Sequence, residues 1–234
     1  MTEPTYVLVP GAGGKPSFWD RVVPLLRAAG RSAVAVGLPN WPGATLTDQG
    51  DAIVMAGQGL TEVVLVAHSM GGFSAPLACD RLPVVRLVLV NAMIPTSGET
   101  AGTWWENVGQ PGAVRENETR SGRDPDAPFD PDTVFLHDLP PDLAELLRDG
   151  DEGPADSLFE QVYPLDAWPD VSTEVLSGVD DRLFPYELQR RVARVRLGLA
   201  TEPVPGGHLL ALSQPESLTE RLLRTSWGAG VAQA

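Results

Sequence analysis

The stretch Val63-Val64-Leu65-Val66-Ala67-His68-Ser69-Met70-Gly71-Gly72 decides the fold of this chain. A short apolar run leads directly into a serine that has small residues two positions before and two positions after it. This order predicts a buried strand, a sharp turn at Ser69 and a helix that begins near Phe73. In such a turn the serine hydroxyl is exposed at the end of the sheet, and the backbone N–H of the following residue can face a developing oxyanion. The stretch therefore favours an enzyme.

Only small residues are tolerated two positions away from the serine in this kind of turn. The usual pattern is Gly-x-Ser-x-Gly, which Gly71 keeps and Ala67 does not. A methyl group is the smallest departure from glycine that a protein can make. We therefore expect Ala67 to be compatible with the turn.

Composition places the chain among globular proteins and excludes several classes of partner. Its 234 residues fit one α/β domain or two small ones, and 43% of them are hydrophobic. The net charge of −14 argues against binding to nucleic acid and disfavours anionic membrane surfaces. Cys79 is the only cysteine, so we expect neither an intrachain disulfide nor a thiolate metal cluster.

No apolar run approaches the roughly 20 residues of a membrane span. The first expected strand starts within about five residues of Met1, which leaves no room for a signal peptide. We therefore expect a cytoplasmic protein that does not bind membranes.

Predicted strands and helices alternate along most of the chain. Short apolar runs predict strands at 6–9, 32–36, 63–66, 84–90, 173–177 and 197–204. Apolar residues at helical spacing predict helices at 18–29, 46–60, from the serine turn to about 81, 186–195 and 216–227, followed by a frayed tail at 228–234. This alternation is typical of an α/β fold with a doubly wound, mostly parallel sheet and helices on both faces.

Residues 95–169 interrupt the alternation. The segment is acidic and rich in proline and glycine, and it holds no convincing strand and two short helical patterns, at 139–148 and 156–162. Because a structureless loop of this length is uncommon in a compact domain, we expect a small helical insertion. The core would then consist of residues 1–94 and 170–234.

The insertion is expected to form a cap that covers Ser69 and shapes its substrate pocket. Candidate pocket walls are Trp104, Trp105 and His137, together with Phe135 and Leu136. The alternative is that these aromatic residues only hold the cap together.

A serine nucleophile needs a base within hydrogen-bonding reach, and that base is oriented by a carboxylate. The chain has three histidines. His137 lies in the insertion, and His68 adjoins Ser69, where neighbouring side chains point apart, so we expect His68 to be structural. His208 lies in a Pro-Gly-Gly-His loop between the last predicted strand and the last helix. This is the sheet edge at which Ser69 also lies, which makes His208 the candidate base.

The carboxylate should come from a loop after an earlier strand. The segment 176–185 contains Asp180 and Asp181 directly after such a strand. The resulting order of serine, aspartate and histidine is the one associated with a strand–turn–helix nucleophile. Either aspartate fits this order.

These motifs together resemble the α/β-hydrolase family over essentially the whole chain. The matching residues are Val9-Pro10-Gly11-Ala12, Ala67-His68-Ser69-Met70-Gly71-Gly72, Gly178-x-x-Asp181-x-x-x-Pro185 and Gly207-His208. The family's acid loop commonly reads Gly-x-x-Asp with proline four residues later, which favours Asp181 over Asp180. The resemblance also implies an oxyanion hole made by the backbone N–H groups of Ala12 and Met70. Pro10 stands where the family usually has histidine.

Within the family, the chain looks similar to compact esterases with a helical cap, which also resemble hydroxynitrile lyases. Those lyases carry a threonine in the oxyanion loop and a lysine just after the histidine, where this chain has Gly11 and Leu209. Lyase activity is therefore disfavoured. Epoxide hydrolases and dehalogenases use an aspartate nucleophile, and Ser69 argues against both.

The glycine-rich segment Gly11-Ala12-Gly13-Gly14-Lys15-Pro16 does not fit a nucleotide site. A dinucleotide fingerprint needs glycine at Pro16 and an acidic residue after the second strand, and a phosphate loop needs serine or threonine after the lysine. Lys15 is expected to be a solvated charge. The scattered histidines do not predict a metal site, and no cofactor is expected.

The sequence thus predicts a serine hydrolase that cleaves a small, uncharged or weakly polar carboxylic ester. A thioesterase, a lactonase or a C–C bond hydrolase of a biosynthetic pathway could use the same residues. A non-catalytic ligand-binding member of the fold is a further alternative. The oligomeric state cannot be predicted from the sequence.

Overall fold

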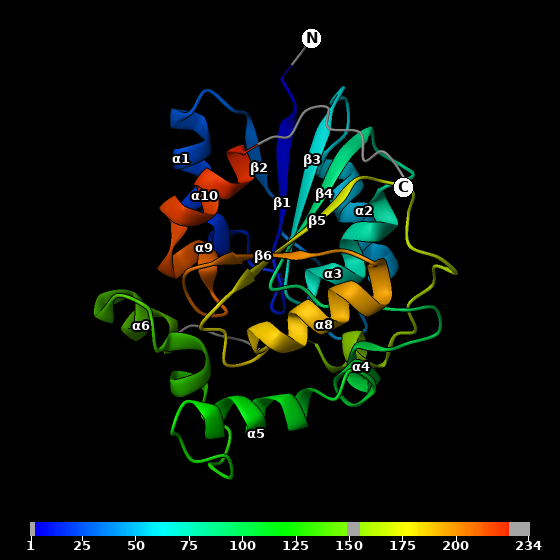
Figure 1. The fold of residues 1–234 in the computed structure, drawn as a ribbon. Helices are drawn as coiled ribbons and strands as arrows, with labels where there is room; N and C mark the ends of the chain where they lie inside the picture. Colours follow the sequence, from blue (N-terminus) through cyan, green and yellow to red (C-terminus); the bar gives the residue numbers. More distant parts are fainter. Residues whose placement is uncertain (1–2, 149–154, 225–234) are drawn as a thin grey trace, which may run out of the picture.

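A six-stranded, all-parallel sheet forms the centre of the protein (Figure 1). The computed structural model describes residues 3–148 and 155–224. The strand order is β2-β1-β3-β4-β5-β6. The strands are β1 (Thr5–Val9), β2 (Ala33–Ala35), β3 (Val63–His68), β4 (Val84–Val90), β5 (Thr173–Gly178) and β6 (Thr201–Val204). The predicted α/β fold with a parallel, doubly wound sheet is confirmed.

Helices cover both faces of the sheet (Figure 1). One face packs on α1 (Val22–Ala28), α9 (Leu210–Ser213) and α10 (Pro215–Leu223), and the other on α2 (Leu46–Ala56), α3 (Gly71–Ser74) and α8 (Tyr186–Leu197). Successive side chains of a strand point to opposite faces, and β3 shows this directly. Leu65 joins the core beneath α2 and α8, whereas Val64 and Val66 join the core beneath α1 and α10. Burial of both faces explains why the central strands β1 and β3 are almost continuous apolar runs.

The strand order reverses between β1 and β3. The chain passes from β1 to β2 on one side and then returns to place β3 on the other side of β1. In sheets of this kind, ligands bind at such a reversal, beyond the carboxyl ends of the strands. Ser69 follows β3 directly, so it lies at this point.

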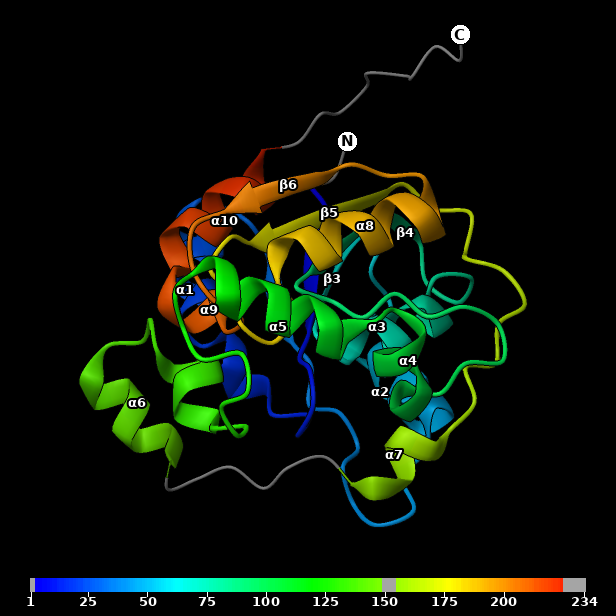
Figure 2. The same ribbon diagram turned by 60° about the horizontal axis from the view of Figure 1, so that its bottom comes forward.

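The segment between β4 and β5 lies over the carboxyl edge of the sheet (Figures 1 and 2). It contains α4 (Ala101–Asn107), α5 (Gln110–Arg120), a π-helical turn (Asp132–Leu136), α6 (Pro141–Arg148) and α7 (Asp156–Glu160). The first part of this segment contacts α8 and the loop before α8 through an ion pair and a hydrogen bond. Glu99 forms a buried ion pair with Arg196, and the Gln110 side chain donates to the carbonyl oxygen of Leu183 over 2.7 Å.

The predicted strand at 197–204 is too long at its start. Helix α8 continues to Leu197 and ends at Gly198, which has a φ of 70°. A left-handed glycine is a common helix terminator, so the chain can enter β6 only at Thr201. β6 is therefore a short edge strand, and it contains Pro203, a residue that sheets tolerate at their edges.

Several predicted helices are shorter than expected. The predicted helix from the serine turn to about 81 is wrong, because α3 gives way to a 3₁₀ turn at Ala75–Ala78 that contains Pro76. Proline lacks the N–H that an α-helix would use there. The helix predicted at 46–60 ends at Ala56, and that at 18–29 begins as a 3₁₀ turn before α1. The tail predicted at 228–234 and the last residues of the helix at 216–227 lie outside the described residues.

Candidate active site

Ser69 occupies a strained turn between β3 and α3. Its φ is 50°, in the left-handed region that residues other than glycine rarely adopt. The turn is held by two backbone hydrogen bonds. Ser69 N–H donates to the carbonyl oxygen of Val90, and Met93 N–H donates to the carbonyl oxygen of Ser69 over 2.9 Å. Strain of this kind persists only where the surroundings enforce it, and it is common at functional sites. The residue is 8% exposed, so Ser69 is almost entirely buried.

The small residues around Ser69 have different reasons to be small. A Cβ atom at Gly71 would lie 2.6 Å from the Pro10 carbonyl oxygen, and one at Gly72 would overlap the Met93 carbonyl oxygen. Both obstacles are backbone atoms, which cannot move aside cheaply. Ala67, by contrast, is a fully buried strand residue paired with β1 and β4. The turn therefore requires glycine after the serine and accepts alanine before it.

The structure brings Ser69, His208 and Asp181 together. His208 Nε2 lies 3.0 Å from Ser69 Oγ, and His208 Nδ1 lies 2.9 Å from Asp181 Oδ2. His208 and Asp181 are 2% and 1% exposed, so the contact between them is shielded from water. Asp180 is exposed, and its backbone N–H donates to Gly206. A hydroxyl, an imidazole and a buried carboxylate in this order can activate the hydroxyl as a nucleophile.

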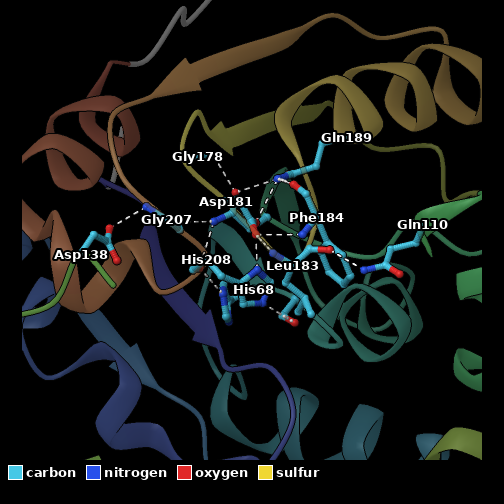
Figure 3. Close-up of polar contacts among 12 residues, drawn as sticks. His68, Gln110, Asp138, Gly178, Asp181, Leu183, Phe184, Gln189, Gly207 and His208 are labelled. Atoms are coloured by element: carbon cyan, nitrogen blue, oxygen red, sulfur yellow. Dashed lines mark hydrogen bonds and ion pairs between the residues drawn. The ribbon is translucent and has the colours of Figure 1, made fainter. Parts of the chain in front are cut away.

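Besides its contact with His208, the Asp181 carboxylate accepts three hydrogen bonds (Figure 3). Its Oδ1 accepts from the backbone N–H groups of Leu183 and Phe184 over 2.9 and 2.8 Å. Its Oδ2 accepts from the Gln189 side chain over 3.1 Å and lies next to His208. Together these donors leave the carboxylate one position, pointing at His208.

The loop after β1 passes directly beside Ser69. A Cβ atom at Gly11 would lie 2.8 Å from Ser69 Cβ, so only glycine allows this approach. The next residue, Ala12, is exposed, and Met70 precedes the first turn of α3. N–H groups at a helix start are not used inside the helix, so they can serve an external acceptor. Lys15 is exposed at the start of the 3₁₀ turn before α1.

His68 is buried and contacts the backbone of the loop that carries His208. Its Nε2 lies 3.0 Å from the His208 carbonyl oxygen, and its ring stacks on Phe18 with the centroids 4.2 Å apart. Burial lowers the pKa of His68 well below its ordinary value, and His208 nearby lowers it further. His68 is therefore neutral and donates from Nε2. This arrangement fits the structural role expected from the sequence.

His137 and Asp138 lie against the loop that carries His208. Asp138 Oδ2 accepts from the Gly207 N–H over 2.6 Å (Figure 3). A Cβ atom at Gly207 would lie 2.9 Å from both His137 Nε2 and Asp138 Oδ1. Burial lowers the pKa of His137, and Arg182 nearby lowers it further. The segment over the sheet edge thus contacts the loop of the candidate base.

The aromatic residues predicted as pocket walls occupy different environments. Trp104 is 2% exposed and donates from Nε1 to the Ile94 carbonyl oxygen, so it belongs to the core beneath the segment. Trp105 is half-buried and packs on Phe184, with the centroids 5.3 Å apart. Phe184 and Phe135 both approach the His208 ring, at 5.1 and 5.6 Å. Leu136 packs in a separate small cluster near α6 and α9.

Asn91 and Gln189 belong to no motif of the sequence, although both contact the group around His208. Asn91 follows β4 directly and bonds to the last residue of β5 and to the loop after β6. Gln189 lies in α8 and bonds to Asp181. The only available signal for Asn91 was one polar residue directly after an apolar strand, at the carboxyl edge of the sheet.

Within residues 3–148 and 155–224, no helix is long and apolar enough to cross a membrane. In the same residues, no group of three or more His, Cys, Asp or Glu side chains could hold a metal ion.

Comparison with known proteins adds a family to this geometry. The sequence matches the model of the alpha/beta hydrolase family over residues 6–221. It is 28% identical over 264 aligned residues to the protein named "Probable esterase PIR7A" of Oryza sativa subsp. indica, with 94% of this chain and 95% of that protein covered.

Two solved structures share the fold. The crystal structure of polyneuridine aldehyde esterase superposes with a TM-score of 0.74 at 20% identity, covering 95% of this chain and 98% of that one. A pyrethroid hydrolase from Sphingobium faniae JZ-2 gives a TM-score of 0.73 at 22% identity, covering 94% and 96%. These findings confirm the resemblance expected from the motifs: the chain belongs to the alpha/beta hydrolase family.

Proposed function

We propose that this protein is a serine hydrolase that cleaves a small carboxylic ester through an acyl-enzyme on Ser69. The observation that carries the proposal is the pair of contacts made by His208, 3.0 Å to Ser69 Oγ and 2.9 Å to Asp181 Oδ2. The strained turn at Ser69 and its position at the reversal of strand order support the same conclusion.

In the proposed mechanism, Ser69 Oγ attacks the ester carbonyl carbon while its proton passes to His208 Nε2. Asp181 keeps the imidazole oriented and stabilises the imidazolium that forms. The backbone N–H groups of Ala12 and Met70 stabilise the oxyanion of the tetrahedral intermediate. The bond to the alkoxy group then breaks, and His208 gives its proton to the departing alcohol.

Water completes the cycle. His208 takes a proton from water as the water oxygen attacks the acyl carbon of the Ser69 ester. Collapse of this second intermediate releases the carboxylic acid and returns the proton to Ser69 Oγ. No cofactor or metal takes part in either half of the reaction.

The proposed substrate is small and uncharged or weakly polar. Phe135 and Phe184 lie beside the ring of the candidate base, and Trp105 packs on Phe184, so the surroundings suit an apolar group of an ester. The net charge of −14 disfavours an anionic substrate. The names of the similar proteins, an esterase and a pyrethroid hydrolase among them, point to the same bond type.

We also propose that residues 95–169 act as a cap on a core of residues 1–94 and 170–234. The position of α4 to α7 over the carboxyl edge of the sheet supports this division (Figure 2). The contact of Asp138 with Gly207 supports it as well, because it joins this segment to the loop that carries His208.

A fluorophosphonate probe tests the nucleophile. Mass spectrometry of the folded wild-type protein should find one adduct, on Ser69, and Ser69→Ala should give none. A wild-type protein that stays unlabelled contradicts the proposal and favours a non-catalytic ligand-binding role.

A substrate panel tests the bond type. Esters and thioesters with acyl chains of graded length are supplied to the wild type and to Ser69→Ala. We expect turnover of short-chain esters to fall about 10⁴-fold or more in the variant. Faster turnover of thioesters than of matched esters would favour a thioesterase instead.

A further inference from the structure

Asn91 occupies a backbone conformation that suits few residues. It lies directly after β4, it is 0% exposed, and its φ is 46°. Asparagine is among the few residues other than glycine that enter this left-handed region readily. Its own N–H donates to the Leu176 carbonyl oxygen in β5 over 3.0 Å, which fixes the turn to the neighbouring strand. The backbone that carries the Asn91 side chain is therefore held in place.

The side-chain amide of Asn91 uses its full hydrogen-bonding capacity. Its Nδ2 donates to the carbonyl oxygens of Gly207 and His208, over 3.0 and 2.9 Å. Its Oδ1 accepts from the Gly178 N–H over 2.7 Å and from Gln189 Nε2 at 3.3 Å. A primary amide has two donor protons and two acceptor lone pairs, and all four are engaged here. Because two partners are carbonyls, the orientation of the amide is unambiguous.

Three of these partners lie in, or directly before, the loops that carry the candidate base and the candidate acid. Gly207 and His208 follow β6, and Gly178 is the last residue of β5. The loops touch closely, since a Cβ atom at Gly178 would lie 2.6 Å from the Gly206 carbonyl oxygen and 2.7 Å from that of Gly207. Asn91 is thus the side chain at which the ends of three strands meet.

The contact extends to the carboxylate through Gln189. The same Nε2 atom that approaches Asn91 Oδ1 also lies 3.1 Å from Asp181 Oδ2 and 2.6 Å from the Phe184 carbonyl oxygen. Asn91 therefore touches the backbone of the base directly and reaches the acid through one further side chain.

We propose that Asn91 is a positioning residue, whose side-chain amide holds the His208 backbone and the Asp181 loop in the register that places His208 Nε2 against Ser69. The inference rests on the proposed function, because it assigns Asn91 a role in the same site. It acts through His208 and does not touch the substrate. Misplacement of a reacting group by about 1 Å can cost roughly 10²-fold in rate, so a residue that fixes this register has a large effect without being catalytic.

Two variants separate the amide from the backbone turn. Asn91→Gly keeps the left-handed φ and removes all four side-chain hydrogen bonds. Asn91→Asp keeps the size and the acceptor but removes both donors to Gly207 and His208. Gln49→Ala is the matched control: Gln49 is another buried amide, 4% exposed, that bonds to the Pro39 carbonyl oxygen and to Ser74.

The first measurement is the rate of fluorophosphonate labelling of Ser69 between about pH 5 and about pH 9. The high-pH plateau should fall about 10²-fold in both Asn91 variants and stay near the wild-type value in Gln49→Ala. Asn91 variants that are folded and labelled at the wild-type rate overturn the inference and leave the proposed function intact. A wild-type protein that is not labelled at all overturns the proposed function.

The second measurement does not depend on activity. The proton on His208 Nδ1, shared with Asp181, should give a downfield NMR resonance in the wild type and in Gln49→Ala. This resonance should shift or vanish in Asn91→Gly, and an unchanged resonance overturns the inference. If neither Asn91 variant folds, the wild type decides: the Asn91 side-chain amide resonances should shift when the fluorophosphonate probe modifies Ser69, and unchanged resonances overturn the inference.

Discussion

The ring of His68 donates a hydrogen bond from Nε2 to the carbonyl oxygen of His208 over 3.0 Å. The residue directly before the candidate nucleophile thus holds the backbone of the candidate base. The two rings lie 4.9 Å apart, and Phe18 stacks on the outer face of His68. The serine turn and the histidine loop are separated by well over a hundred residues in sequence, and this contact makes them one structural unit.

Because His68 is buried and neutral, it should make stability depend on pH. Its pKa is lower in the folded protein than the ordinary value near 6.5, so the unfolded chain binds a proton that the folded protein does not. The stability that neutral His68 contributes is fully present above about pH 6.5, and it declines as the pH falls below this value. In His68→Gln, which keeps a hydrogen-bond donor but does not titrate, the unfolding free energy should fall less steeply as the pH decreases. The slope should differ from that of the wild type by up to about 1.4 kcal/mol per pH unit. Denaturant unfolding across this range checks it, and parallel curves for variant and wild type would contradict it.

The two adjacent aspartates should differ sharply in effect. Asp181→Asn should lower ester turnover about 10³–10⁴-fold, since the neutral amide no longer stabilises the imidazolium and can hold the wrong tautomer. Asp180→Asn is the matched control, and because its side chain is exposed it should leave the rate nearly unchanged. Initial rates with a short-chain ester measure both. A reversed result would assign the acid to Asp180.

Glycine at position 71 should be required for stability as well as for the turn. A methyl group there would lie 2.6 Å from the Pro10 carbonyl oxygen, so Gly71→Ala should cost about 1–3 kcal/mol of unfolding free energy. Gly112→Ala is the control, because a Cβ atom at Gly112, in α5, meets nothing within 4 Å. That variant should be more stable than the wild type by about 0.5–1 kcal/mol. Denaturant unfolding compares the two, and equal stability of Gly71→Ala and wild type would argue against the close approach.

The parallel sheet could be predicted because its central strands β1 and β3 are buried on both faces and are therefore almost continuous apolar runs. Ser69 and His208 could be singled out because both lie in loops after predicted strands, at the same edge of the sheet. The strand pattern does not choose between Asp180 and Asp181, and only the resemblance to the family's acid loop favours Asp181. The helices α4 and α5 could not be predicted in the same way. α5 is polar on almost every side, and within it only Gln110 is buried, so it carries no apolar stripe to detect.

Asn91 was beyond prediction for a different reason. Its importance comes from four partners on β5, α8 and the loop after β6, and none of them is near it in sequence. A single polar residue after a strand does not reveal how many elements converge on it. The start of β6 differs from the prediction because Leu197 and Leu199 extend the apolar pattern across the helix end that Gly198 sets.

The shortness of β6 has a consequence for which positions can vary in evolution. The strand that precedes the His208 loop is weakly secured, with four residues, one neighbouring strand and a proline. Yet the His208 carbonyl is held from the middle of the sheet, by His68 at the end of β3 and by Asn91 after β4. The edge can therefore accumulate substitutions and length changes while the base stays in place. Substitutions along β6 should have little effect on the position of His208, and substitutions at His68 and Asn91 should have a large one.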